Sequence, residues 1–133
     1  MKALIVDDEF TSQLILQKSL MEYGETQIAS SGKEAIDVFS DAIMLNERFD
    51  LICLDIMMPD IDGQQVLKEI RALEDMEGLH GDDAVKVIMI SSLSDKKNIM
   101  EAFKSQCEAY LVKPIDGAKL RKHLETFGLL EKF

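Results

Sequence analysis

The sequence predicts one α/β domain in which a five-stranded parallel sheet carries helices on both faces. Three observations support this fold class. Five short apolar runs alternate with five segments of helical periodicity. The apolar runs end in polar or charged residues, as buried parallel strands do where they leave a sheet. The chain has 133 residues, which is enough for one domain with a hydrophobic core and too few for two.

The expected strands occupy residues 2–6, 26–30, 50–54, 85–90 and 109–112. The run at 26–30 is shorter and less apolar than the others, which favours a position at the edge of the sheet. Alternating strands and helices predict right-handed crossovers and a doubly wound sheet. For five such units the expected strand order is the flavodoxin-like 2-1-3-4-5.

The expected helices run from 10 to 23, from 32 to about 48, from 63 to 73, from 95 to 106 and from 117 to about 127. Their apolar residues recur at helical spacing. Leu16 and Leu20 share one face of the first helix, and Ile99, Ala102 and Phe103 are expected to point inward from the fourth. These stripes provide the surfaces that cover the sheet.

Polar residues mark where the helices start. Ser31 and Glu34 fit a capping box, and Asp62 and Asp116 stand where side-chain caps are favoured. Residues 74–84 are acidic, contain glycine and show no periodicity, so we expect them to form an exposed loop.

Composition excludes several classes of protein. The formal net charge is -10, whereas binding to a nucleic-acid backbone needs clustered lysine and arginine. The apolar runs are far shorter than the roughly 18 residues of a membrane span, and the first residues do not form a signal peptide. Two cysteines make no disulfide framework, which favours a reducing compartment. We therefore expect a cytoplasmic protein with no direct nucleic-acid or membrane partner.

Chemically capable side chains follow four of the five strands. Asp7 and Asp8 follow the first, Asp55 the third, Ser91 the fourth and Lys113 the fifth. In the 2-1-3-4-5 order these strands are neighbours, and the second strand, at the edge, ends without such a residue. Because ligands of open parallel sheets bind at the carboxyl ends of the strands, these five side chains are expected to meet in one site.

Three carboxylates in one site repel one another by about 4 kcal/mol per pair at 4 Å and an effective dielectric near 20. A Mg²⁺ ion relieves that repulsion and takes oxygen ligands, whereas zinc would need histidine or cysteine, which these strand ends lack. A divalent cation beside carboxylate, hydroxyl and ammonium groups is equipment for phosphoryl transfer.

The residue types suggest a role for each member of the site. Asp55 is the expected nucleophile and phosphoacceptor, and Asp8 with Asp7 is expected to bind Mg²⁺. Ser91 would donate a hydrogen bond to the phosphoryl group, and Lys113 would pair with it as a point charge. Taken singly, Ser91 could be an ordinary serine at a strand end and Lys113 a solvated charge. Their joint placement favours the chemical interpretation.

Four segments resemble the successive signatures of one known family. They are residues 5–8 (IVDD), 54–63 (LDIMMPDIDG), 88–92 (IMISS) and 110–114 (YLVKP). Together they resemble response-regulator receiver domains, the CheY-like family, over nearly the whole chain. The resemblance implies two-component signalling, in which a sensor histidine kinase or a histidine phosphotransfer protein donates a phosphoryl group to Asp55.

The same resemblance implies a ligand set and a switch. Asp8 and Asp55 would contact Mg²⁺ directly, Asp7 mainly through water, and the backbone carbonyl of Met57 would complete the protein ligands. The Lys113-Pro114 peptide would be cis. Phosphorylation would draw the Ser91 hydroxyl toward the phosphoryl oxygens and turn Tyr110 inward. That change would remodel the surface formed by the fourth helix, the fifth strand and the fifth helix.

Met57 also bears on how long the phosphoryl group would persist. Fast-hydrolysing relatives often carry a polar residue two positions after the acceptor. A methionine cannot orient an attacking water, so the resemblance implies a comparatively long-lived aspartyl phosphate.

The chain ends about six residues past its last helical stripe. Residues 1–133 are therefore expected to form a single receiver domain without an output domain. We expect it to act on a downstream protein or to pass its phosphoryl group on. It would catalyse only its own phosphorylation and autodephosphorylation, as a monomer or as a phosphorylation-dependent homodimer.

Three other functions account for these residues less well. A phosphorylation-independent binding module would not need the complete set of chemical residues. A Mg²⁺-dependent aspartyl phosphatase would want a second aspartate two residues after the nucleophile, where Met57 stands. A flavin mononucleotide carrier would need a loop rich in serine, threonine and glycine at residues 7–9, where three acids stand.

Overall fold

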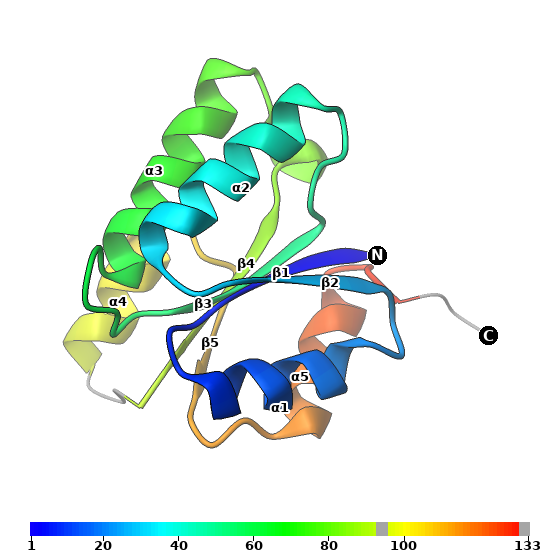
Figure 1. Cartoon of the computed structure of the whole chain (residues 1–133), viewed down its shortest axis with the longest axis vertical. Helices are drawn as coiled ribbons and strands as arrows, with labels where there is room; N and C mark the ends of the chain where they lie inside the picture. Colours follow the sequence, from blue (N-terminus) through cyan, green and yellow to red (C-terminus); the bar gives the residue numbers. More distant parts are fainter. Residues whose placement is uncertain (93–95, 131–133) are drawn as a thin grey trace.

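The computed structural model describes residues 1–92 and 96–130. Its sheet has five parallel strands in the order β2-β1-β3-β4-β5, which confirms the predicted fold class and strand order (Figure 1). The strands are β1 (Lys2–Val6), β2 (Glu25–Ala29), β3 (Leu51–Asp55), β4 (Lys86–Ser91) and β5 (Ala109–Val112). The helices are α1 (Phe10–Leu20), α2 (Gly32–Met44), α3 (Gly63–Met76), α4 (Lys96–Lys104) and α5 (Gly117–Thr126), with a short 3-10 helix, η1 (Gly81–Asp83), before β4.

Helices cover the sheet on both faces. α2, α3 and α4 lie on one face and α1 and α5 on the other (Figure 1). Side chains of β1 alternate between two hydrophobic cores: Leu4 and Val6 face the first group of helices, and Ala3 and Ile5 face the second. Fully burying a valine, leucine or isoleucine side chain stabilises the fold by about 1.5–3 kcal/mol. The central strands are therefore fixed from both sides.

The strand register sets the position of the candidate site. Val6 of β1 stands beside Leu54 of β3, and Asp55 stands beside Ile90 of β4. Ser91, the last residue of β4, stands beside Val112 of β5. The strands β1, β3, β4 and β5 thus end at the same edge of the sheet, and the residues that follow them emerge together.

The residues that cap the amino ends of α2, α3 and α5 are those that the sequence predicts. The Ser31 hydroxyl accepts a hydrogen bond from the Glu34 amide at 3.1 Å, and the Asp62 carboxylate accepts one from the Gln65 amide at 2.9 Å. Asp116 caps α5 in the same way. Each bond satisfies an amide that the helix itself leaves unpaired.

The carboxyl end of α2 was predicted too late in the chain. The helix ends at Met44 rather than near residue 48. Asn46 adopts a φ of 56°, in the left-handed region, and asparagine reaches that region more readily than most residues. A left-handed residue directly after a helix ends it.

The prediction that residues 74–84 form an exposed loop is wrong at its start. α3 continues to Met76, and Glu74 is only 2% exposed. One oxygen of Glu74 lies 2.6 Å from Arg71 Nη1, and the other accepts a hydrogen bond of 2.6 Å from the Val85 amide. Arg71 also pairs with Glu108 at 3.0 Å, just before β5. Glu74 therefore connects the end of α3 to Val85, the residue just before β4. Most of residues 75–83 are exposed, as predicted.

Fewer side chains of α4 face the hydrophobic core than the sequence predicts. Ala102 is fully buried, but Phe103 is 46% exposed, so the inward prediction for Phe103 is wrong. A short helix that contacts the sheet through a small residue leaves its neighbours on the rim of the contact. Residue 95, where this helix was expected to start, lies outside the described residues.

Within the described ranges, every helix is too short or too polar to cross a membrane.

We expect Glu74→Ala to lower the free energy of unfolding by about 1–3 kcal/mol, because it leaves the buried Val85 amide without its acceptor and removes one of several acceptors of the Arg71 guanidinium. Urea denaturation measures the loss. Glu77→Ala, at an exposed position one turn further on, is the matched control and should change stability by less than about 0.5 kcal/mol. Equal losses for the two variants would contradict the proposed role of Glu74.

Candidate functional site

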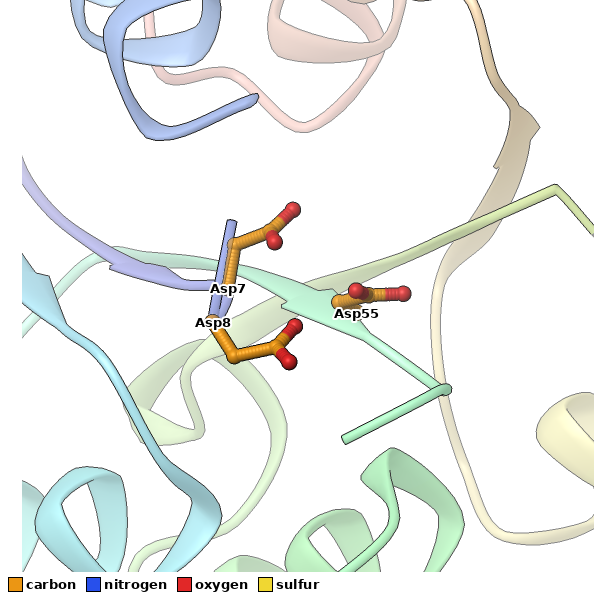
Figure 2. A group of neighbouring side chains, drawn as sticks. All are labelled: Asp7, Asp8 and Asp55. Atoms are coloured by element: carbon orange, nitrogen blue, oxygen red, sulfur yellow. The ribbon is translucent and has the colours of Figure 1, made fainter. Parts of the chain in front are cut away.

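Three carboxylates lie together at the carboxyl edge of the sheet, as the sequence predicts. Asp7 and Asp8 directly follow β1, and Asp55 is the last residue of β3. One oxygen from each lies within 4.8 Å of the others. Figure 2 shows the three side chains extending to the same side of the two strand ends. Asp7 is fully buried, Asp55 is 5% exposed, and Asp8 is exposed, so the cluster opens to solvent through Asp8.

Lys113 bridges two of these carboxylates from the end of β5. Its Nζ lies 3.0 Å from Oδ2 of Asp7 and 3.4 Å from Oδ2 of Asp55. The Lys113 amide donates a hydrogen bond of 2.8 Å to the carbonyl of Ser91, which ties this segment to the end of β4. The Lys113-Pro114 peptide is cis, as the family resemblance implies.

Each bridged carboxylate is held at both oxygens. Oδ1 of Asp7 accepts a hydrogen bond of 2.9 Å from the Glu9 amide, and Oδ1 of Asp55 accepts one of 3.3 Å from the Met57 amide. In both cases the donor is the amide two residues further along the same loop, and Oδ2 is left to Lys113. Local loop geometry therefore orients both side chains before any ligand binds.

The pKa values reflect crowding of negative charge. Burial and, after it, the charge of Asp7 raise the pKa of Asp55 from 3.8 to about 6, because Lys113 and the hydrogen bond from the Met57 amide only partly offset them. Burial alone would lower the pKa of Lys113, but hydrogen bonding to Asp7 and the charges of both aspartates outweigh it and raise that pKa. Lys113 is thus a cation at neutral pH, and the cluster holds more formal negative than positive charge.

The donor set fits a hard divalent cation. Within the described residues, this cluster offers oxygen ligands and no histidine or cysteine. Mg²⁺ prefers oxygen ligands and is commonly held by one or two carboxylates. Burial raises the pKa of Cys53, inside β3, to about 12, so this thiol is no candidate ligand. A Mg²⁺ ion would also offset the charge that raises the pKa of Asp55.

The two expected switch residues, Ser91 and Tyr110, differ in how deeply they are buried. Ser91 is fully buried at the end of β4, beside the Lys113 segment. Tyr110 lies in β5 and packs, partly buried, against the core on the α2–α4 face. Met57, two residues after Asp55, has a side chain that is 58% exposed.

Sequence reasoning missed two polar residues that contact the loops of this site. Gln13 lies on the same helical stripe as Leu16 and Leu20, is 8% exposed, and donates a hydrogen bond to the carbonyl of Asp7. A polar residue on an apolar stripe is a signal that could have identified it. Asp60 accepts hydrogen bonds from the first turn of α2, a contact that no local pattern indicates.

This topology, with an acidic cluster and a lysine at the carboxyl edge of the sheet, defines a CheY-like signalling domain. The chain belongs to the response regulator receiver domain family, whose model matches residues 3–125. It is 33% identical to the chemotaxis protein CheY-3 of Vibrio cholerae over 127 residues, which cover 94% of this chain and 89% of that protein.

Solved structures agree with this assignment. The chain aligns with one in the CheX–CheY–BeF₃–Mg²⁺ complex of Borrelia burgdorferi at a TM-score of 0.78 and 27% identity, covering 96% of this chain and 89% of that one. It aligns with one in the complex of the Saccharomyces cerevisiae phosphotransfer protein Ypd1 and the receiver domain of Ssk1 at a TM-score of 0.82 and 26% identity, covering 96% and 88%.

Several other curated relatives are longer proteins. The chain spans 25% to 47% of the length of transcriptional regulators that it matches at 31% to 34% identity.

The raised pKa of Asp55 predicts a pH-dependent stability. A carboxyl group whose pKa is higher in the folded protein opposes folding once it ionises, so the penalty is absent below about pH 4 and complete above about pH 7. Without divalent cations, Asp55→Asn should therefore raise the free energy of unfolding by about 1–3 kcal/mol at pH 7.5. The gain should largely vanish at pH 4.

Urea denaturation in the presence of a chelator, at both pH values, measures this effect. Asp41→Asn, at an exposed position on α2, is the control and should give no comparable gain. A stabilisation by Asp55→Asn that is the same at both pH values would contradict the prediction.

Proposed function

We propose that the protein is a phosphoacceptor response regulator in which Asp55 receives a phosphoryl group from a phosphohistidine donor. The observation that carries this proposal is the joint contact of Lys113 with Asp7 and Asp55 inside a cluster of three carboxylates. A cation-binding acid pair, a carboxylate nucleophile and a fixed ammonium are the parts that phosphoryl transfer to an aspartate needs.

The transfer forms one bond and breaks one. An oxygen of Asp55 attacks the phosphorus, and the bond between phosphorus and the donor's imidazole nitrogen breaks. Its electron pair stays on that nitrogen, and the imidazole leaves neutral either because its other ring nitrogen already carries a proton or because the leaving nitrogen takes one up. Lys113, already 3.4 Å from Oδ2 of Asp55, compensates charge on the phosphoryl oxygens. The buried Ser91 hydroxyl serves as a further donor.

Asp8 and Asp55 would hold Mg²⁺ directly, Asp7 mainly through water, and the Met57 carbonyl would complete the protein ligands. When bound, Mg²⁺ supplies charge neutralisation for the transferred group. The residues themselves orient the nucleophile: the Met57 amide and Lys113 each hold one oxygen of Asp55. The protein would catalyse only its own phosphorylation and autodephosphorylation.

Phosphorylation would act as a local charge change that biases a two-state element. Ser91 would move toward the new phosphoryl oxygens, and Tyr110, now partly buried in β5, would turn further inward. The surface of α4, β5 and α5 would then present a different shape to a downstream protein, or to a second copy of the chain. A phosphorelay role, in which Asp55 passes the group on, uses the same chemistry.

The test is the intact mass of wild type and Asp55→Asn after incubation with acetyl phosphate, with and without Mg²⁺. We expect one phosphoryl adduct on wild type that requires Mg²⁺ and is absent from the variant. An adduct of equal yield on Asp55→Asn would contradict the assignment of the acceptor. No adduct on wild type from either acetyl phosphate or a phosphorylated protein donor would favour a phosphorylation-independent binding module.

Met57 should control the lifetime of the phosphoryl group. Its exposed thioether cannot direct a water molecule to the phosphorus, whereas an amide at this position can. Met57→Asn should speed dephosphorylation by about threefold to tenfold, well below the roughly 100-fold or more of full general acid–base catalysis, because the amide only orients the water. Loss of the adduct with time, followed by mass, measures the rate. Met57→Leu should decay like wild type, and decay of the asparagine variant at the wild-type rate would refute the idea.

An apolar surface beside the site fits the protein that would donate the phosphoryl group. Phe10 and Ile15 of α1 are 70% and 46% exposed. Ile15 also lines a groove of about 350 Å³ with Lys113, Pro114 and Ile115. Because Lys113 belongs to both the groove and the carboxylate cluster, a partner docked here places its histidine near Asp55. Ypd1, the phosphotransfer protein in the complex with the Ssk1 receiver, is a partner of this chemical class.

Ile15→Ser should therefore slow transfer from a protein donor and spare transfer from acetyl phosphate. With phosphorylated Ypd1 as the probe, we expect kcat/KM to fall by about threefold to tenfold, as for loss of one partly buried aliphatic contact. Met44→Ser, at an exposed position at the far end of α2, is the matched control. Equal loss with both kinds of donor would mean that Ile15 supports the site and not the docking of a partner.

A further inference from the structure

The turn that joins β2 to α2, residues 30–33, has no part in the proposed chemistry. It is nevertheless linked through Gln13 to the loop after β1, which carries Asp7 and Asp8, and it directly contacts the loop that follows Asp55. We propose that Gln13 and Asp60 are positioning residues that use this turn to fix the spacing between the two loops. The inference rests on the proposed function, because the spacing matters only if the carboxylates share a cation.

Gln13 connects the turn to the loop after β1. Its Nε2 donates a hydrogen bond of 2.7 Å to the carbonyl of Asp7 and one of 3.2 Å to the Ser30 hydroxyl. The Asp7 amide in turn donates to the carbonyl of Ala29 at 3.2 Å. Because the Gln13 side chain is buried, water cannot readily replace these bonds. The backbone of Asp7 is therefore held by both α1 and the end of β2.

Asp60 connects the same turn to the loop after β3. Its Oδ1 accepts a hydrogen bond of 3.2 Å from the Gly32 amide, and its Oδ2 accepts one of 3.0 Å from the Lys33 amide. These amides belong to the first turn of α2, which has no partners for them within the helix and which favours negative charge. The hydrogen bond from Lys33 is the main reason that the pKa of Asp60 lies below its usual value.

Gly32 shows that turn and loop are in direct backbone contact. A Cβ atom added to Gly32 would lie 2.8 Å from the carbonyl oxygen of Ile61 and 2.8 Å from Cγ2 of Val66. Only a residue without a side chain allows this approach. The loop after β3 therefore has no room to shift toward α2, and Asp60 prevents it from shifting away.

These contacts form one connected path. It runs from the carbonyl of Asp7 through Gln13 to Ser30, along the turn to Gly32, and through Asp60 to the loop that contains Met57. Asp7 lies at one end of this path, and the loop at the other end directly follows Asp55. Residues that orient metal ligands from outside the ligand set often change metal affinity by about 10–100-fold when they are lost. Here the path acts through backbone, so a smaller effect is expected.

The test is the dissociation constant of Mg²⁺, measured by isothermal titration calorimetry, for wild type, Asp60→Ala, Gln13→Leu and the double variant. We expect each single variant to bind Mg²⁺ about threefold to tenfold more weakly. Asp60→Asn, which keeps one acceptor oxygen, should recover part of the loss. Because both residues act through one turn, the double variant should lose less than the product of the single effects.

Two matched controls distinguish a specific effect on Mg²⁺ affinity from a general loss of stability. Ser31→Ala weakens the same end of α2 by removing its bond to the Glu34 amide, but it breaks no contact with the loop after β3. Gln17→Leu removes a 3.5 Å contact from α1 to Thr26 and leaves the loop after β1 untouched. Both should bind Mg²⁺ within about twofold of wild type, whatever they cost in urea stability.

Unchanged Mg²⁺ affinity in both Asp60→Ala and Gln13→Leu, with wild type binding normally, would overturn this inference and leave the proposed function intact. A loss in Ser31→Ala as large as that in Asp60→Ala would also overturn it. If wild type itself binds no Mg²⁺ and forms no phosphoryl adduct, the proposed function fails, and the inference fails with it.

Discussion

The contact of the Lys113 ammonium with Asp7 and Asp55 is the constraint on which the rest of the site depends. Two carboxylates that are nearly removed from water repel each other, and a single cation at 3.0 and 3.4 Å partly compensates both. The compensation is incomplete, because burial and the charge of Asp7 still raise the pKa of Asp55 to about 6. The folded protein therefore keeps an excess of negative charge at one point, which is the condition for binding a divalent cation.

The sheet makes this contact possible. Lys113 and Asp7 are separated by 106 residues in the sequence, and the parallel pairing of the strands brings the carboxyl ends of β1 and β5 to one edge. The two hydrophobic cores hold the strands from both faces. Because these cores are closely packed, the repulsion between the carboxylates does not push the strand ends apart. At the opposite ends of the strands, Arg71 and Glu74 secure α3 to the start of β4. The site thus gains its geometry from contacts far from it.

Much of this could be predicted from the sequence, because the determining signals are local. Apolar runs that end in Asp7, Asp55 and Ser91 identify strands and their functional edge, and short caps such as Ser31 identify helix starts. The features that were missed depend on partners distant in sequence. Glu74 is buried because the chain returns to it at Val85, whose amide donates to it, and because its neighbour Arg71 is held by the distant Glu108; nothing in the acidic stretch indicates either contact.

The same reason explains the other differences. Phe103 has the spacing of an inward residue, but α4 contacts the sheet through Ala102, which leaves Phe103 on the rim. Asp60 lies in an ordinary turn sequence, and its hydrogen bonds with the Gly32 and Lys33 amides depend on how α2 meets the loop after β3. Gln13 is an intermediate case, since a polar residue on the Leu16–Leu20 stripe could have been recognised as a buried hydrogen-bonding group.

The most direct test of the site as a whole uses beryllofluoride, which forms a stable mimic of the aspartyl phosphate. Thermal unfolding is measured with Mg²⁺ alone, with beryllofluoride alone and with both, for wild type and Asp55→Asn. If the cluster is a cation-assisted phosphoryl site, the two ligands together stabilise wild type well beyond Mg²⁺ alone, by about 2.7 kcal/mol at a hundredfold excess over the dissociation constant. Asp55→Asn should show no such gain. An equal gain in the variant, or none in wild type, would contradict the assignment of Asp55 as the phosphoacceptor.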